Sequence, residues 1–319
     1  MGRESNMEEQ EQQPAKDQAE PELLYHYTNQ KGLLGILDSK SIWATHSHFL
    51  NDFSEHQIIF NALREIVQQE LKNERNENWA NVFNRLLRTR QEEEVFVSSF
   101  SEGSEGDSLA MWRGYASDTC GYSIGFDPVA LKTLAFSFIP IGKSGYGALC
   151  KCFYVDPENS DFRSNLKRII EIKLPNFVNP PETSSEYDWY NPKSIFMQIP
   201  MEIRECANIL AGSAACGKHI GFHEEKEWRI VLIDEKDCLT NRTKFHHGKS
   251  MLIPHVEISW ADMEMPNPIR RIVVGPTPNK DEAVKAIEMM LAGMGLQERI
   301  DEPSEGIRVV PSKIPYRNW

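Results

Sequence analysis

The sequence of 319 residues lacks the long apolar runs of a membrane protein. No stretch approaches the ~18 uninterrupted apolar residues that a membrane-spanning helix requires. The first residues show no basic cap followed by an apolar run, so we expect no secretory signal. Asn6 stands where a myristoylation motif needs Ser or Thr. We therefore expect a cytoplasmic protein with no membrane partner.

Motifs of several common enzyme classes are also missing. There is no GxGxxG loop of a Rossmann fold, no GxSxG nucleophile elbow and no HExxH zinc motif. Residues 212–218 match the GxxxxGK part of a P-loop, but His219 replaces the Ser or Thr whose hydroxyl binds Mg²⁺. The segment also follows a predicted helix instead of a strand. We therefore exclude a P-loop and interpret Gly217 as a helix C-cap, with Lys218 as a favourable cation beside it.

Cysteine is scarce, with six irregularly spaced residues. This pattern excludes a disulfide framework and favours reduced, buried thiols. Cys150 and Cys152 are two apart, so they would share one face of a strand. Cys216, His219 and His223 have spacings compatible with zinc, but no clear second ligand pair accompanies them.

A second group of polar residues contains possible metal ligands. Its members are His46, His48, Asn51, Asp52 and Glu55. Asn51-Asp52 is equally a turn followed by a helix N-cap. We expect no metal at either group.

Positive charge is in short supply, with 35 basic against 47 acidic residues and a net charge of −12. Residues 1–22 hold −5 of this charge, are rich in Glu and Gln, and contain no aromatic or β-branched residue. They are predicted to form a disordered acidic tail. The remaining chain is only mildly acidic, which disfavours a general nucleic-acid coat but allows a local basic groove.

Hydrophobic periodicity predicts strands and helices in irregular alternation. The expected strands are 23–27, 42–44, 95–100, 121–126, 149–155, 227–233, 251–258, 269–274 and an edge strand at 307–310. The expected helices begin near Asn29 and then cover 53–91 (as two helices), 109–116, 162–172, 193–215 and 281–293, with a long loop at 175–192. Because regular βαβ units are absent, the fold class is α+β. Residues 23–319 form one predicted domain with helical insertions at about 53–93 and 157–220.

The segment FHEEKEWR at 222–229 carries the most chemistry. If it is extended, Glu225, Glu227 and Arg229 lie on one face of a strand. Two carboxylates so close together can raise the pKa of one of them, as in many active sites. Equally, Arg229 simply pairs with a carboxylate at an exposed strand start.

Aromatic residues elsewhere also have two interpretations. Trp112 and Tyr115 are three apart on a predicted helix and can be plain core residues. His26, on the first strand, can be a buried and hydrogen-bonded histidine. Both interpretations stay open at this point.

The segments FLND, SFSE, DSLAMWRGYA…GYSIGFD, EEKEWR and VVGP together resemble a bacterial family catalogued only as a domain of unknown function (family 2971), over roughly residues 24–274. More distantly, the pattern is similar to the ADP-ribosyltransferase superfamily. Those enzymes bind NAD in a mixed split sheet, with His or Arg on the first strand and a catalytic Glu on a later strand. The resemblance implies an α+β fold with a mixed split β-sheet core of ADP-ribosyltransferase type.

The same resemblance implies roles for the first strand and for the acids. His26 would hold the adenosine ribose, and Tyr27 and Thr28 would contact the nicotinamide. Glu227 would be the catalytic Glu, with Glu225 as the first acid of an ExE pair.

The resemblance further implies a cofactor-binding set in the middle of the chain. Ser99 and Ser101 match the Ser-x-Ser element, Tyr115 and Tyr122 would stack on the nicotinamide ring, and Trp112 would line the same site. A first-strand His belongs to one branch of the superfamily, whereas Ser-x-Ser and ExE belong to another. The spacing of the two tyrosines also differs from the toxin-like pattern.

The implied function is that of an ADP-ribosyltransferase-like enzyme or NAD glycohydrolase, acting as a toxin or antiviral defence effector. NAD is the substrate, and the acceptor is a protein or nucleic acid. Cleavage of the nicotinamide–ribose bond passes through an oxocarbenium-like state, which a carboxylate on the ribose 2′-hydroxyl stabilises as charge develops. This hypothesis requires His26, Tyr115 and Glu227 to line one cleft.

Two alternatives remain. One is a non-catalytic regulatory module that binds a nucleotide or a partner. The other is a metal-dependent hydrolase, which needs His46, His48, Asp52 and His223 to converge.

Overall fold

The computed structural model describes residues 21–50, 61–62, 65, 94–115, 120–139, 145–156, 214–234, 240–298 and 306–315. Almost all of the predicted acidic tail lies outside these residues. So do most of the two predicted helices at 53–91, the predicted helix at 162–172 and the predicted loop at 175–192. Within the described part, no helix has the length and apolar character needed to cross a membrane.

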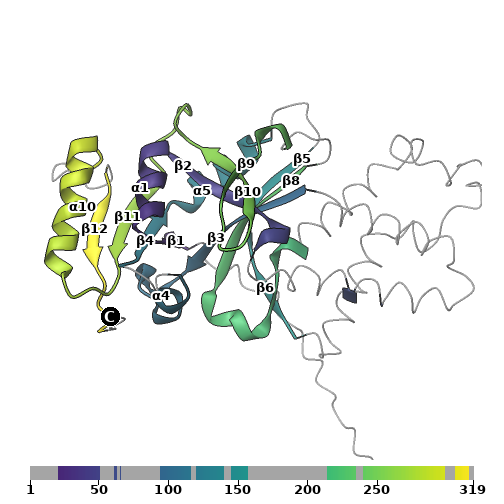
Figure 1. Ribbon diagram of the computed structural model, residues 1–319, viewed down its shortest axis with the longest axis horizontal. Helices are drawn as coiled ribbons and strands as arrows, with labels where there is room; N and C mark the ends of the chain where they lie inside the picture. Colours follow the sequence, from purple (N-terminus) through teal and green to yellow (C-terminus); the bar gives the residue numbers. More distant parts are fainter. Residues whose placement is uncertain are drawn as a thin grey trace, which may run out of the picture.

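A mixed sheet of ten strands forms the centre of the described part of the chain (Figure 1). Its strands are β1 (Leu24–Thr28), β2 (Ser41–His46), β3 (Glu94–Glu102), β4 (Tyr122–Phe126), β5 (Gly145–Lys151), β8 (Glu227–Asp234), β9 (Lys244–His247), β10 (Leu252–Ser259), β11 (Ile269–Val274) and β12 (Arg308–Pro311). The strand order is β12-β11-β4-β1-β3-β2-β10-β9, and β8 pairs with both β3 and β5. Only β11 and β12 pair in parallel within this sheet. The predicted α+β class with a mixed sheet is confirmed.

The sheet divides at β3, which pairs with three other strands. β8 occupies one edge of β3 from Glu94 to Ser101. The other edge pairs with β2 at Phe96 and Val97 and with β1 at Ser101 and Glu102. Since β1 and β2 share one edge, they diverge on either side of Ser99. The described sheet is therefore split at the middle of β3.

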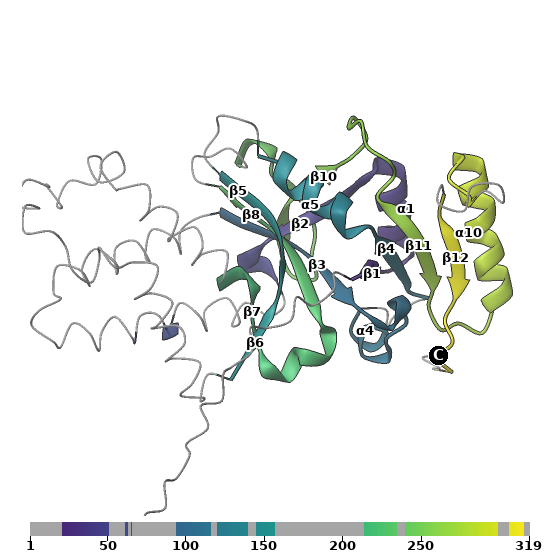
Figure 2. The same ribbon diagram turned by 180° about the vertical axis from the view of Figure 1, so that it is seen from behind.

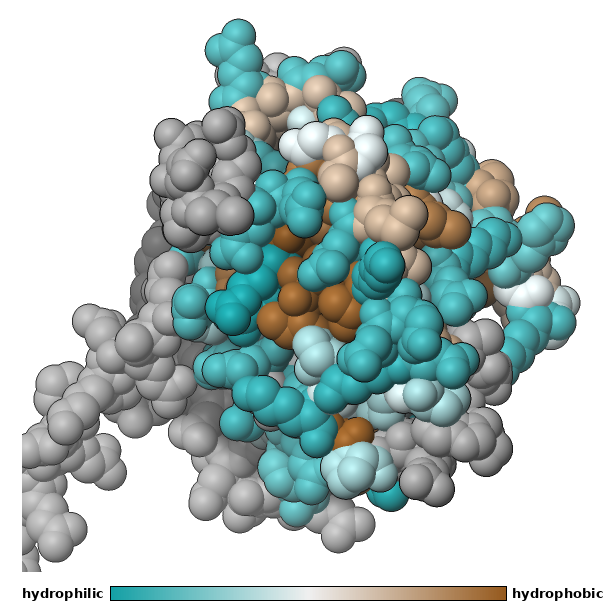
Figure 3. Space-filling model, turned by 90° about the vertical axis from the view of Figure 1, so that its left-hand side faces the viewer, coloured by the Kyte–Doolittle hydropathy of each residue, from teal (hydrophilic) through white to brown (hydrophobic). Residues whose placement is uncertain are grey.

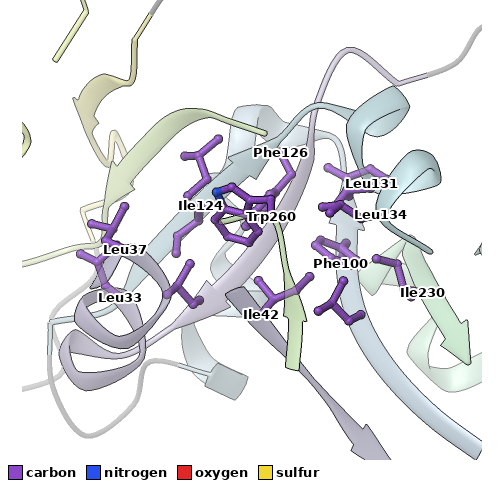
Figure 4. Close-up of a cluster of buried hydrophobic side chains, with 14 of the residues drawn as sticks. Leu33, Leu37, Ile42, Phe100, Ile124, Phe126, Leu131, Leu134, Ile230 and Trp260 are labelled. Carbon is purple, nitrogen blue, oxygen red and sulfur yellow. The ribbon is translucent and has the colours of Figure 1, made fainter. Parts of the chain in front are cut away.

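One face of the sheet carries the larger hydrophobic core (Figure 4). The helices on this face are α1 (Gln30–Ser39), α5 (Pro128–Ser137) and α10 (Lys280–Met294). Their buried side chains include Leu33 and Leu37 from α1 and Leu131 and Leu134 from α5, which belong to the same cluster as Phe100 of the sheet. Burying each such side chain contributes about 1.5–3 kcal/mol. We call this face the helical face.

The opposite face carries shorter elements, some of which are labelled in Figure 2, where the molecule is seen from behind. They are η2 (Ser104–Gly106), α4 (Leu109–Tyr115), the two-stranded sheet of β6 (Phe153–Val155) and β7 (Gly217–His219), and η4 (Ile220–Glu225). Trp112 of α4 packs against Tyr27 of β1, with ring centroids 4.8 Å apart. A separate apolar cluster joins Val97 and Val231 to Cys152 and Cys216. We call this the polar-site face. Two further short helices, η1 (Ser47–Phe49) and η5 (Thr240–Arg242), complete the elements.

Several predicted elements need correction. Helix α5 was not predicted, although Asp127 caps it and Pro128 occupies its first turn, which is a common helix start. Strand β9 was also not predicted, because only Phe245 among its four residues is a large apolar residue. The predicted strand 149–155 is in fact β5, which begins at Gly145, followed by the separate strand β6.

The region around Gly217 differs most from its prediction. Residues 214–216 are helical, as the end of the predicted helix 193–215 requires. Gly217 and Lys218, however, belong to strand β7, which pairs in parallel with β6. Lys218 is buried, so it is not an exposed cation at a helix end.

Candidate functional site

Four charged side chains form a buried centre on the polar-site face at the start of β8. The Lys218 ammonium lies 2.6 Å from Oε2 of Glu225 and 2.7 Å from Oε2 of Glu227. Arg229 donates to Glu227 through Nε at 2.7 Å and through Nη2 at 3.0 Å. Glu227 and Arg229 are only 5% and 6% exposed. We call this group the ion centre.

The backbone around the ion centre brings these side chains together from three elements. Lys226 adopts the left-handed conformation with φ 43°, which ends η4 and lets β8 begin at Glu227. Glu225 therefore lies in η4 and not in an extended strand, which corrects the prediction for that residue. The prediction that Glu227 and Arg229 share one strand face is confirmed by their mutual hydrogen bonds.

Neighbouring polar groups fix the same segment. The Tyr154 hydroxyl accepts a hydrogen bond from the Glu227 amide at 2.7 Å. Ser101 donates through its hydroxyl to the Glu225 carbonyl oxygen at 2.7 Å. Arg229 donates through Nη1 to the Ala215 carbonyl oxygen at 2.7 Å. The ion centre is thus tied to β3, to β6 and to the residues before β7.

The charges of the centre stabilise one another. Burial alone would raise the pKa of Glu227, but Arg229 and Lys218 overcome it and lower that pKa below its ordinary value of 4.5. Burial would lower the pKa of Lys218, but Glu227 and Glu225 raise it above its ordinary value. Glu227 and Lys218 therefore both stay ionised at neutral pH. The expected rise in the pKa of Glu227 is therefore not seen, because Arg229 and Lys218 both bind its carboxylate.

The remaining acceptor capacity of Glu227 limits its chemistry. A carboxylate offers about four acceptor positions. Arg229 Nε uses one on Oε1, while Lys218 Nζ and Arg229 Nη2 use two on Oε2. About one position on Oε1 is left for a hydroxyl group of a ligand.

Both serines of the predicted Ser-x-Ser element share a face with the ion centre. Ser101 lies directly opposite Glu227 in the β3–β8 ladder, and Ser99 lies opposite Arg229. Opposed residues of an antiparallel pair project from the same face. Tyr27 is on this face as well, because its neighbour Tyr25 at the two-residue spacing is opposite Ser101.

The aromatic residues of α4 have different environments. Trp112 is 1% exposed and donates through Nε1 to Asp107 Oδ1 at 2.8 Å, so it is a core residue. Tyr115 ends α4 and is 44% exposed. Helix α4 contacts η4, the element that carries Glu225, so the helix that ends at Tyr115 lies beside this part of the polar-site face.

His26, Thr28 and Tyr122 lie on the helical face, opposite to Glu227. His26 follows Tyr25 by one residue and its ring packs against Phe100, a residue of the larger core. Its Nδ1 lies 3.0 Å from the carbonyl oxygen of Ser99. This carbonyl is at the split, where neither β1 nor β2 pairs with β3. His26 thus bridges the split, and burial lowers its pKa.

The other two residues on the helical face, Thr28 and Tyr122, also lie within the sheet. Thr28 pairs with Tyr122 across β1 and β4. Burial raises the pKa of Tyr122 to about 12, so its hydroxyl stays protonated. The requirement that His26 and Glu227 line one cleft is therefore not met.

Possible metal ligands do not gather in the described residues. No three His, Cys, Asp or Glu side chains there are arranged to hold a metal ion. His46 and His48 are adjacent, with ring centroids 5.1 Å apart, and His46 pairs with Glu94 at 2.6 Å. Asn51, Asp52 and Glu55 lie outside the described residues. The exposed His223 bonds the carbonyl oxygen of Ile220.

Three free cysteines lie beside Arg229. Cys150 is opposite Arg229 in the β5–β8 ladder, and the Cys216 thiol hydrogen-bonds with those of Cys150 and Cys152. These bonds and burial raise the pKa of Cys216, while the bond from Cys216 lowers that of Cys150. The shared face of Cys150 and Cys152 was predicted from their spacing, but the approach of Cys216 was not.

Sequence reasoning missed Lys218, Tyr154 and Asp107 as site or framework residues. The sequence pattern predicts Lys218 at a helix end, although a Lys two residues after Cys216 and within ten residues of two acids is also a signal for pairing. Asp107 lies just before the segment that forms α4. Its carboxylate accepts hydrogen bonds from Trp112, from the Ser312 hydroxyl and from the Lys313 amide. No local pattern indicates these long-range contacts.

Residues 111–230 match the family described as Protein of unknown function (DUF2971). The match covers most of α4, the strands β4 to β7 and the ion centre. This match supports the family that the sequence motifs predict, over part of the 24–274 span of the resemblance. No curated protein and no solved structure matches the chain.

Proposed function

We propose that this protein is an ADP-ribosyltransferase-like enzyme that cleaves the nicotinamide–ribose bond of NAD, with its site at the ion centre on the polar-site face. It transfers ADP-ribose to a protein or nucleic-acid acceptor, or to water, as a cytoplasmic toxin or defence effector. The observation that carries the proposal is the common face of the Ser-x-Ser and ExE elements, with Ser101 opposite Glu227 and Ser99 opposite Arg229. The split of the mixed sheet at β3 supports it.

The proposal leaves His26 out of the site. In the form that requires His26 to hold the ribose beside Glu227, the hypothesis is abandoned, because the two residues lie on opposite faces. A first-strand His and a Ser-x-Ser/ExE pair belong to different branches of the superfamily. The geometry favours the Ser-x-Ser/ExE version, in which His26 supports the split sheet.

The chemistry assigned to Glu227 follows from its surroundings. Arg229 and Lys218 keep the carboxylate ionised, and one acceptor position on Oε1 is open. A hydrogen bond from the ribose 2′-hydroxyl to this oxygen strengthens as positive charge develops at the anomeric carbon. Ser99 would contact the nicotinamide ribose, and the exposed ring of Tyr115 would stack on the nicotinamide.

The test is release of nicotinamide from NAD, followed by chromatography, with the parent and Glu227→Gln proteins. We expect at least ~100-fold slower release for Glu227→Gln, the size of effect that removal of one transition-state contact has elsewhere. Glu257→Gln is the matched control, because Glu257 is a strand residue that pairs with exposed Lys244 away from the site. Circular dichroism shows whether each variant is folded. Equal rates for Glu227→Gln and the parent would refute the assignment.

A non-catalytic binding module is the second candidate. The observation that favours it is the closure of the ion centre, in which Glu227 is 5% exposed and three donors already hold its oxygens. Such a centre can serve folding alone and leave the polar-site face to bind a nucleotide or a partner. Calorimetry that detects NAD binding, together with no nicotinamide release, would select this candidate.

A further inference from the structure

A second charged site lies on the polar-site face at the opposite end of the sheet. It is a pocket of about 510 Å³ between η2 and the strands β11 and β12. Its lining residues are Glu105, Asp107, Arg271, Val273, Arg308, Val310, Pro311 and Lys313. Figure 3 views the side of the molecule that carries α10 and β12, where hydrophilic side chains surround a patch of apolar ones. The pocket likewise combines a few apolar residues with charged ones.

Two arginines stand next to each other in this pocket. Arg271 and Arg308 are paired positions of the parallel strands β11 and β12. Neighbouring strands are about 4.8 Å apart, so the two cations repel unless an anion lies between them. Among the described residues, no carboxylate forms an ion pair with either guanidinium. Arg271 donates only to the Tyr25 hydroxyl, at 3.2 Å, and burial raises the pKa of that tyrosine, so it stays neutral.

The two acids of the pocket are already engaged. Asp107 accepts hydrogen bonds from Trp112 and Ser312 on Oδ1 and from the Lys313 amide on Oδ2. Glu105 lies 3.5 Å from the Lys313 ammonium. The three cations outnumber the two acids, so the pocket is locally basic in a protein whose net charge is −12.

The pocket is separate from the ion centre, although both lie on one face. Helix η2 covers the sheet between them, and Gly106 of η2 sits directly on Tyr25. A Cβ at Gly106 would lie 2.3 Å from the Tyr25 ring, and φ is +76° there, so only glycine fits. A small ligand in the pocket therefore does not touch Glu227.

We propose that this pocket binds a phosphate-bearing small molecule, and that the guanidinium groups of Arg271 and Arg308 bind its phosphate. Two neighbouring guanidinium groups offer parallel N–H forks that match phosphate oxygens. Val273, Val310 and Pro311 supply an apolar wall for the rest of the ligand. The volume lies in the range of small-molecule sites, about 300–1,000 Å³.

The first measurement is calorimetry with pyrophosphate as the probe, on the full chain at low salt. We expect binding that weakens as KCl rises, because the contacts are ionic. Arg308→Gln should lower the affinity for pyrophosphate at least ~10-fold, since one of the two phosphate-binding cations is lost. Arg308 is exposed and makes no described ion pair, so this variant should fold normally. Arg271→Gln should weaken it similarly.

Arg270→Gln is the matched control. Arg270 is the neighbour of Arg271 on β11, lies at the register shift between Ile269 and Arg271, and is 3.5 Å from Asp127. It should bind pyrophosphate within ~2-fold of the parent. Absence of binding to the parent at millimolar pyrophosphate, or equal affinity of Arg308→Gln and the parent, would overturn the proposal.

Two further arms identify the ligand class and separate this proposal from the preceding one. ADP that binds more tightly than pyrophosphate supports a nucleotide ligand whose base uses the apolar wall. Equal affinity supports recognition of the phosphate group alone. Arg308→Gln should release nicotinamide from NAD at the parent rate. The two proposals can therefore be refuted independently of each other.

Discussion

The ion centre lies on the same face of the sheet as the pocket of Arg271 and Arg308, which we call the basic pocket. The two regions balance their charges differently. A single row of paired positions joins them across the strands, through Arg308, Arg271, Gly125, Tyr25, Ser101 and Glu227. At one end, Lys218 and Arg229 are neutralised by Glu225 and Glu227 and are buried. At the other end, two arginines line a pocket of about 510 Å³, and neither has a carboxylate partner among the described residues.

The difference teaches how each region is stabilised. Moving an ion out of water costs several kcal/mol, so a buried charge persists only with a partner. The ion centre therefore depends on all its members, and removal of one leaves an uncompensated charge. The arginines of the pocket are exposed (Arg308) or half-buried (Arg271), so the fold depends less on their neutralisation. Internal charges thus hold the first region together, whereas the second region keeps its charges for a ligand.

The strongest way to break this comparison is the substitution Arg229→Leu. It removes both hydrogen bonds to Glu227 and the one to the Ala215 carbonyl oxygen. We expect a loss of about 3–5 kcal/mol in the free energy of unfolding, measured with urea. Arg270→Leu on β11 is the control and should cost at most ~1 kcal/mol, because its pair with Asp127 is partly exposed. A loss below ~1 kcal/mol for Arg229→Leu would mean that the ion centre does not hold the fold.

His26 offers a second, smaller test, because its ring links β1 to β3 at the split of the sheet, beside the row of positions that joins the two regions. His26→Ala leaves the Ser99 carbonyl oxygen without its hydrogen bond. We expect a cost of about 1–3 kcal/mol, as for a buried polar group that loses its partner. His247→Ala, at an exposed position of β9, should change stability by less than ~0.5 kcal/mol. If both variants melt at the parent temperature, His26 is not a structural bridge.

Part of the ion centre was predictable, because side chains on a strand alternate between its two faces. Side chains two apart on a strand share a face, so Glu227 and Arg229 could be placed together from the sequence alone. The backbone of Lys226 could not be predicted in this way, because its left-handed φ breaks the strand one residue before Glu227. Lys218 reaches the centre through the pairing of β6 with β7, and no local pattern specifies such pairing.

The faces of His26 and Glu227 show a deeper limit of sequence reasoning. Each residue was correctly expected on a strand. Whether the two share a face depends on the register of β1 with β3 and of β3 with β8. A shift of one residue in either ladder would move His26 to the face of Glu227. The sequence contains the strands, but the register follows from packing of the whole sheet.

The pH dependence of stability provides a further comparison between the ion centre and the basic pocket. The folded pKa of Glu227 is below 4.5, so its ionisation stabilises the fold above pH 4.5 and this contribution is lost as pH falls through the folded pKa. Urea unfolding of the parent at several pH values below 4.5 should show the loss, and Glu227→Gln should lack that part of it. Arg308→Gln leaves Glu227 and its two cationic partners unchanged, so this variant should follow the parent curve. An identical acid profile for Glu227→Gln and the parent would contradict the assigned pKa shift.

The smallest expected effect is the one that defines the basic pocket. Arg308→Gln removes an exposed cation whose nearest charged neighbour across the strands is Arg271. We expect the free energy of unfolding at low salt to change by less than ~0.5 kcal/mol, and to rise if it changes, because repulsion between the two arginines is relieved. The rise should vanish in 1 M KCl, where charges are screened beyond about 3 Å. A salt-independent loss of stability would instead show that Arg308 contributes to the fold, and the pocket would then resemble the ion centre more than it differs from it.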